Sequence, residues 1–225
     1  DKNKVIDDGF IKAFSRLIST ITVSSDQKII KGIKLAEIKG MIESFSVKEE
    51  KFIDETYYVN LGVAFNKKKI FNYLENKNVF PSVPNRKKFL LFPIIIEEKN
   101  DNLIAFSENN LFNNWNKYNK KSHLLEYLLP TEDLEDLNLI KKNYETIEKY
   151  NFEEITRKYN LDDSIVTLVF KNNNNVRILS RITIEDKVVL KNLSFSDINF
   201  DDEDDITNLI DKLKIIYEDH WKIFN

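Results

Sequence analysis

Cysteine is absent from the 225-residue chain, and it holds only four Gly, four Pro, two His and one Met. Without cysteine, a disulfide scaffold, a zinc ribbon, an iron–sulfur cluster and a thiol nucleophile are all excluded. His123 and His220 lie far apart in sequence and form no metal-binding His motif. The few glycines build neither a phosphate-binding loop nor a GxSxG nucleophile motif. The sequence therefore contains no recognisable catalytic motif, and we expect a protein that is not an enzyme and needs no cofactor.

Long hydrophobic runs are also missing, since none reaches the roughly 18 apolar residues that a membrane-spanning helix needs. The longest runs, Phe89–Ile96 and Ile165–Phe170, have the length of strands. What the chain does contain is 42% hydrophobic and 12% aromatic residues, enough for a packed core, so a disordered chain is excluded. The net charge of −3 does not favour a nucleic-acid partner.

Residues 1–78 have the pattern of a small α+β domain. Apolar residues recur every three or four positions in three segments, which predicts helices, and alternate in two others, which predicts an antiparallel strand pair. The expected order is α-α-β-β-α, followed by a Pro-containing linker at 79–88. The predicted elements are helices over 5–21 and 25–42, strands over 45–50 and 56–65, and a helix that begins after Asn66.

Residues 89–225 predict a second α+β domain, with a mixed sheet flanked by helices. The near-continuous apolar run at its start is typical of a strand buried on both faces. Three alternating segments near the end, joined by short polar turns, predict a meander. The predicted strands are 89–96, 103–106, 164–171, 176–185 and 187–195, and the predicted helices are 109–118, 144–159, 206–224 and one that starts near Thr131.

The acidic run of Asp201, Asp202, Glu203, Asp204 and Asp205 is the sharpest local feature. Clustered carboxylates are candidate ligands for Ca²⁺ or Mg²⁺, although the glycine of an EF-hand loop is missing. The same acids also precede a predicted helix, where they would cap its N-terminus and complement its dipole. Both interpretations stay open.

Other charged residues suggest two further alternatives. Glu97 and Glu98 follow the buried strand, and the carboxyl end of a strand is a frequent ligand position, so an enzyme that binds a metal or small ligand is one alternative. The basic groups Lys67–Lys69 and Arg86–Lys88 make weak nucleic-acid binding another, although we expect no nucleic-acid partner.

Seven segments carry a resemblance by their order and spacing: Gly9–Leu17, Ile42–Glu50, Tyr57–Asn66, Leu90–Ile94, Trp115, Leu128–Leu137 and Tyr159–Leu168. Together they resemble an uncharacterised proteobacterial envelope family, domain of unknown function 2066. The second half is also similar in element order to the N-terminal domain of the Tol-system translocation protein. The resemblance implies a secreted periplasmic or lipid-anchored protein without a catalytic site, and relatives that act by binding proteins.

The start of the chain at Asp1 fits either a shortened chain or a mature protein whose signal peptide or anchor has been removed. Together with the resemblance, this leads us to expect a non-catalytic, periplasmic or envelope-associated bacterial protein. It would act as a protein-binding or assembly module for an envelope partner. The predicted strands Leu103–Phe106 and Lys187–Phe195 are the candidate docking edges.

Overall fold

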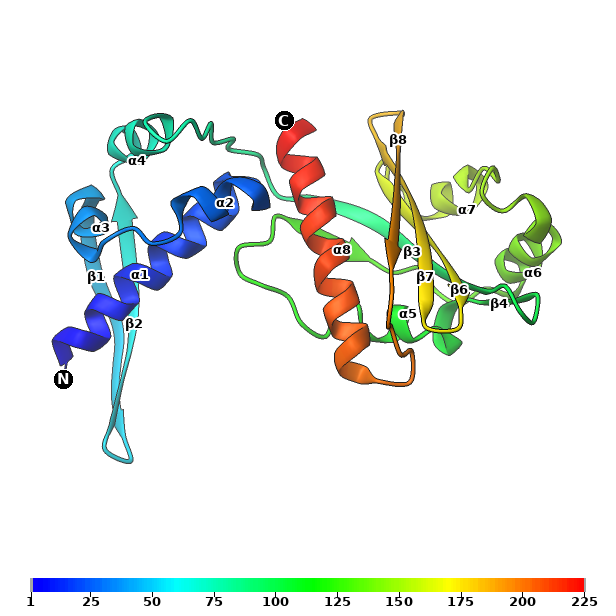
Figure 1. Cartoon of the computed structure of the whole chain (residues 1–225), viewed down its shortest axis with the longest axis horizontal. Helices are drawn as coiled ribbons and strands as arrows, with labels where there is room; N and C mark the ends of the chain where they lie inside the picture. The colour runs from blue at the N-terminus through cyan, green and yellow to red at the C-terminus, as the bar shows by residue number, and fades with distance from the viewer. Residues whose placement is uncertain (1, 225) are drawn as a thin grey trace. The chain divides into compact units, whose positions relative to one another are not determined.

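The computed structural model describes residues 2–224, which fold into two compact units (Figure 1). The first unit contains the chain up to Asn85, the short segment Lys120–Leu124 and the end of the chain from Ile215. The second contains Arg86–Asn119 and Leu125–Lys214. Helices and strands occur in both units, so the predicted α+β class is confirmed. No helix in the described part of the chain is long and apolar enough to cross a membrane.

The first unit is built around a long amphipathic helix that packs on a two-stranded hairpin. One face of the helix is buried, and its Phe14 contacts Phe65 of the hairpin edge to face, with 6.0 Å between the ring centres. The antiparallel strand pair is confirmed. The elements are α1 (Lys2–Ile21), α2 (Ser24–Ile30), α3 (Leu35–Met41), β1 (Ile42–Ile53), β2 (Thr56–Phe65) and α4 (Lys67–Glu75).

The predicted helix 25–42 is wrong as a single element, because the structure divides it into α2 and α3. Gly32, between the two, has a φ of +97°, a left-handed conformation that only glycine adopts without strain. Glu37 accepts a hydrogen bond from the backbone N–H of Lys34 (3.1 Å), which starts the new helix. The order is therefore α-α-α-β-β-α. The predicted cap of α4 is confirmed, since the Asn66 side chain accepts from the Lys69 N–H.

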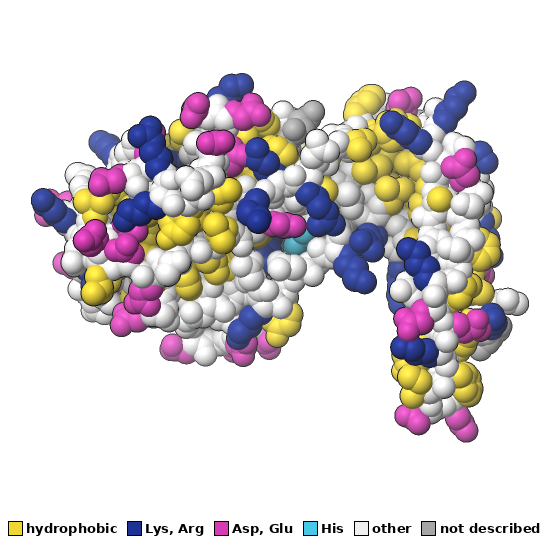
Figure 2. All heavy atoms as spheres, turned by 180° about the vertical axis from the view of Figure 1, so that it is seen from behind, with side chains coloured by type: hydrophobic (Ala, Val, Ile, Leu, Met, Phe, Trp, Pro, Cys, Tyr) yellow, Lys and Arg dark blue, Asp and Glu magenta, His cyan; other side chains and the backbone are white. Residues whose placement is uncertain are grey.

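The far end of the hairpin projects beyond α1. Phe52 is 72% exposed there, and Ile53 and Tyr58 are also exposed. Figure 2 shows hydrophobic side chains beside acidic ones at this end of the hairpin, where Asp54 and Glu55 form the turn. The hairpin is thus anchored by α1 along one part of its length only.

The end of α8 (Glu203–Phe224) belongs to the first unit because its charged side chains bind that unit's backbone. The buried Lys222 donates to the carbonyls of Ser19 (2.6 Å) and Thr22 (3.0 Å). Asp219 accepts from the backbone N–H of Ser24 (2.8 Å). Sequence periodicity describes α8 as an amphipathic helix but does not show which backbone groups it binds, so this segment was expected in the second domain.

The second unit contains a six-stranded mixed sheet in the order β4-β3-β6-β7-β8, with β5 paired to β3 beside β4. β3 is parallel to β6, and β6, β7 and β8 form the predicted antiparallel meander. The apolar run predicted to be buried on both faces is residues 89–96 of β3, all of them buried. The strands are β3 (Lys87–Glu97), β4 (Asn102–Ile104), β5 (Leu125–Leu128), β6 (Ser164–Asn172), β7 (Asn175–Ile184) and β8 (Lys187–Phe195).

Helices cover the two faces of this sheet. α6 (Leu134–Lys142) and α7 (Glu153–Thr156) lie on one face, with Ile140 and Ile155 in a core with Phe92 and Leu168, and we call this the α7 face. Figure 1 shows α8 on the opposite side, which we call the α8 face. The short α5 (Asn110–Asn114) and three 3-10 turns complete the unit: η1 (Phe106–Glu108), η2 (Tyr144–Thr146) and η3 (Arg157–Tyr159).

Three predicted elements of the second unit are shorter than expected. The predicted strand 103–106 ends at Ile104, because Phe106 has a φ of +53° and starts a 3-10 turn. The predicted helix 109–118 is only α5. The predicted helix 144–159 is wrong, since short turns and α7 replace it. The periodicity correctly identifies apolar residues of this segment that pack on the sheet, among them Ile147 and Ile155. The helix is interrupted because the Asn151 side chain accepts a hydrogen bond from the N–H of Glu153 and begins a new turn there.

Lys214 of α8 is fully buried in the second unit, with 0% of its surface exposed. Its Nζ donates to the carbonyls of Trp115 (2.6 Å) and Tyr118 (3.1 Å) and to Oδ1 of Asn119 (2.9 Å). A buried ammonium group is tolerated only when its donors are satisfied, and these three acceptors match its three N–H groups. Lys214 thus fixes the irregular segment that follows α5.

Candidate binding surface

The strand register places side chains of β6, β7 and β8 in rows across the sheet. One row consists of Val166, Arg181 and Leu190. Four residues further along β6, a second row consists of Phe170, Arg177 and Ser194. Residues paired in this way point to the same face, and Val166 and Phe170 belong to the core of the α7 face. Each row therefore runs from a buried apolar residue on β6, through an arginine on β7, to β8.

The helical layer on the α7 face ends before it reaches β8. Val166 is buried, but Val188 and Leu190 of β8 are each 55% exposed. β8 also ends the sheet, and no described strand pairs with its other edge. A nine-residue strand with a free edge and exposed apolar side chains is a template on which another strand can add.

A groove of about 740 Å³ lies between β8 and the α7 segment, and we call it the β8 groove. Phe152 and Leu161 line its helical wall, and Arg181, Val188 and Leu190 line its sheet wall. A volume of this size fits several side chains of a ligand. The β8 groove is continuous with the exposed side chains of the free edge.

Arg181 joins the two walls of the β8 groove. Its guanidinium donates to the backbone carbonyls of Glu148 (2.6 Å) and Tyr150. Burial lowers the pKa of Arg181, which nevertheless stays charged because an arginine titrates far above neutral pH. These two hydrogen bonds fix the position of the 144–150 segment relative to β7.

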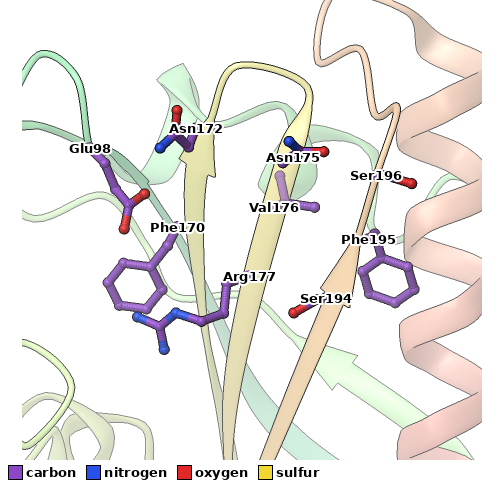
Figure 3. Close-up of a pocket in the computed structure, with 9 residues that line it drawn as sticks. All are labelled: Glu98, Phe170, Asn172, Asn175, Val176, Arg177, Ser194, Phe195 and Ser196. Carbon is purple, nitrogen blue, oxygen red and sulfur yellow. The ribbon is translucent and has the colours of Figure 1, made fainter.

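A second hollow, of about 510 Å³, lies at the other end of the same face (Figure 3). Figure 3 shows the Arg177 guanidinium beside the Phe170 ring, and the distance to the ring centre is 4.0 Å. Arg177 also donates to the carboxylate of Glu148 (2.5 Å). Ser194 of β8 lines this hollow, so the exposed side of β8 borders a recess at each end.

The acidic run acts as the start of α8. Asp202 accepts hydrogen bonds from the backbone N–H groups of Asp204 (2.8 Å) and Asp205 (3.2 Å), which is an N-cap. Asp205 accepts from the Asn199 N–H, and Glu203 pairs with Lys117 (2.9 Å). Within residues 2–224 no three His, Asp or Glu side chains are grouped so that they could hold a metal ion.

The two glutamates predicted as ligand positions lie at the carboxyl end of β3 and point to different hollows. Glu97 and Asp201 line one of about 300 Å³ together with Lys171, whereas Glu98 lines the hollow beside Arg177. Hydrogen bonds from Asn102 and Lys171 lower the pKa of Glu97 and keep it ionised. The site thus brings Glu97 near Asp201 from the acidic run, but Glu97 is already paired with Lys171 (3.3 Å).

The basic groups are dispersed among local contacts. Lys67 lies over the Phe71 ring and Lys69 donates to the Gly40 carbonyl (2.9 Å), both in the first unit. In the second unit Lys87 pairs with the buried Asp163 (2.5 Å). These local contacts use part of the charge that a nucleic-acid site would need.

Of the two predicted docking edges, only one has the required form. Leu103 is buried and β4 has three residues, whereas β8 is nine residues long and exposed. Sequence analysis missed Arg177 and Arg181, although two arginines four positions apart on a predicted strand, and therefore on the same face, are a visible signal. Comparison of the chain with family models, with curated proteins and with solved structures finds no match.

Proposed function

We propose that the protein is a non-catalytic binding module of the bacterial envelope, which takes up a segment of a partner protein by strand addition at β8. The observation that carries the proposal is the free edge of β8 with Val188 and Leu190 exposed above it. Backbone hydrogen bonds along such an edge supply affinity, and the hollows beside it accept side chains. The periplasmic or envelope location rests on the sequence resemblance to domain of unknown function 2066.

Site-specific photo-crosslinking in the native cell tests both parts of the proposal. A photoreactive amino acid at Val188 is expected to join the protein to one defined partner, and the product should fractionate with the envelope. The matched control places the same group at Tyr118, which is similarly exposed (61%, against 55% for Val188) but lies outside the sheet. Equal products from the two positions, or none from Val188, would refute strand addition, and a product in the cytoplasm would refute the location.

A further inference from the structure

The two arginines of β7 on the α7 face differ in their partners. Arg177 pairs with the carboxylate of Glu148 (2.5 Å). Arg181 donates to two backbone carbonyls, and no carboxylate within residues 2–224 forms an ion pair with it. The charge of Arg177 is therefore neutralised inside the chain, whereas Arg181 is a cation without a counter-charge.

Arg181 is also the least exposed of the charged residues that line the β8 groove. The other five lie exposed at its rim: Lys149, Glu153, Arg157, Asp162 and Asp186. Water and salt screen exposed charges strongly and a partly buried charge much less. Burial lowers the pKa of Arg181, and no neighbouring carboxylate opposes this effect. An anion that enters the groove therefore gains most beside Arg181.

The guanidinium has donors to spare for such an anion. It carries five N–H groups, and the two carbonyls accept from two of them. A carboxylate matches the fork of a guanidinium and accepts two parallel hydrogen bonds from it. Ser164 and Thr183, paired across β6 and β7 in the neighbouring row, also line the groove, and their hydroxyl groups can donate to a carboxylate oxygen.

The rim limits the charge of the ligand. Three of its five charged residues are acidic and two are basic, so it offers no excess of positive charge to a second negative group. A single carboxylate balances the one unpaired guanidinium. A phosphate dianion would bring a further charge that the groove does not match.

The remainder of the groove suits an apolar body. Phe152 and Leu161 line its helical wall, and Val166, Val188 and Leu190 line its sheet wall. Its volume of about 740 Å³ is several times that of a carboxyl group, which leaves room for an aliphatic or aromatic part. Each CH₂ group buried there adds to the affinity.

A free molecule reaches this site more directly than a side chain of a strand added at β8. Such a strand would run two strand spacings from β7, about 10 Å away. Leu190, which is paired with Arg181, stands between the two. The geometry therefore favours a small ligand that lies within the groove.

We infer that the β8 groove is a binding site for a small monocarboxylate with an apolar body, its carboxylate on Arg181 and its apolar part between Phe152 and Leu190. This inference goes beyond the proposed function and does not require strand addition at β8.

Four small molecules test the inference on the full chain. Hexanoate is compared with hexylammonium and hexanol, which have a tail of similar length with a positive or a neutral head, and with acetate, which has the carboxylate and almost no tail. Titrations at constant ionic strength follow the NMR signals of the Thr183 and Leu190 amides. Hexanoate is expected to bind at least about tenfold more tightly than each of the other three. No binding of hexanoate, or equal binding of hexanoate and hexylammonium, would overturn the inference.

Removal of the guanidinium is the first variant. Arg181→Gln should weaken the binding of hexanoate at least about tenfold. Lys141→Gln is its control, because it removes one positive charge at an exposed position of α6 that lines neither hollow, and it should leave the affinity unchanged. A folded Arg181→Gln chain that binds hexanoate as tightly as the wild-type chain would contradict the assigned site.

A second pair of variants keeps Arg181 and its hydrogen bonds to the 144–150 segment in place. Leu190→Glu sets a carboxylate directly beside Arg181, at a position that is 55% exposed, and should block hexanoate. Leu190→Gln has nearly the same shape without the charge and should keep most of the affinity. Equal affinities for hexanoate in these two variants would show that the carboxylate does not lie on Arg181.

The outcomes for the ligand and for the partner protein are separate. If hexanoate binds as expected and Val188 crosslinks to no partner, the proposed function fails and the inference stands. If hexanoate does not bind while Val188 crosslinks to a defined partner, the inference fails and the proposed function stands.

Discussion

Arg181 of β7 and Leu190 of β8 occupy directly paired positions, so a partly buried guanidinium lies beside a half-exposed leucine on one face of the sheet. The guanidinium is held by carbonyls of the 144–150 segment, which is where the helical layer over the sheet ends. Beyond that line no helix of the described chain covers β8 on the α7 face, and Val188 and Leu190 are exposed there. The pair thus marks the boundary between the core and the candidate binding surface.

Removing the Arg181 side chain should loosen this boundary. Arg181→Ala leaves the carbonyls of Glu148 and Tyr150 without their donor, and we expect a loss of about 1–3 kcal/mol in the free energy of unfolding. Urea denaturation of the wild-type chain and the variant measures this loss in the free energy of unfolding. Arg157→Ala is the control, because Arg157 is exposed and only pairs with Glu153, so its loss should stay below about 0.5 kcal/mol. Equal losses in both variants would contradict the role assigned to Arg181.

The two glycines near the α2–α3 break should respond in opposite ways to alanine. Gly32→Ala introduces a Cβ at a φ of +97° and should destabilise the chain by about 1 kcal/mol. Gly40→Ala places alanine inside α3, where no atom lies within 4 Å of the new Cβ, and should stabilise it by about 0.5–1 kcal/mol. Thermal unfolding of both variants checks this, and a stabilising Gly32→Ala would mean that α2 and α3 can join into one helix.

Asp202 should matter to stability more than its acidic neighbours. Asp202→Ala removes the cap of α8 and should cost about 1 kcal/mol, whereas Asp202→Asn keeps the acceptor and should cost much less. The measurement is chemical denaturation with and without Ca²⁺. If millimolar Ca²⁺ stabilised the wild-type chain and not Asp202→Ala, the acidic run would be a cation site as well as a cap.

Lys222 should make stability depend on pH in the alkaline range. Burial lowers the pKa of its ammonium group, against the opposing effect of Glu218 and Asp219. Because the folded state disfavours the charged form, this group's contribution to stability increases as pH rises from the lowered pKa towards 10.5, the usual value. The stability difference between the wild-type chain and Lys222→Met should therefore grow with pH in that window. A difference that shrinks with pH would show that the carbonyls of Ser19 and Thr22 outweigh burial.

Periodicity predicts the elements whose packing is regular. The β6–β8 meander and the α4 cap follow from alternation and from one Asn, because these signals act over a few residues. The break at Gly32 was missed, since the apolar repeat continues through it and only the backbone angle reveals it. The sequence predicts one part of the candidate surface, the edge strand Lys187–Phe195. It does not predict where the helical layer above β8 ends, because that depends on the hydrogen bonds from Arg181 to the carbonyls of Glu148 and Tyr150.

The three acceptors around Lys214 make the reactivity of its amine a measure of how often the second unit opens. An amine reagent cannot reach a nitrogen that is fully enclosed and donates all of its hydrogens, so Lys214 should react only in molecules whose unit has opened. Exposed lysines such as Lys141 label at the rate of the reagent. The ratio of the two labelling rates, read by mass spectrometry, then reports how often the second unit opens under native conditions.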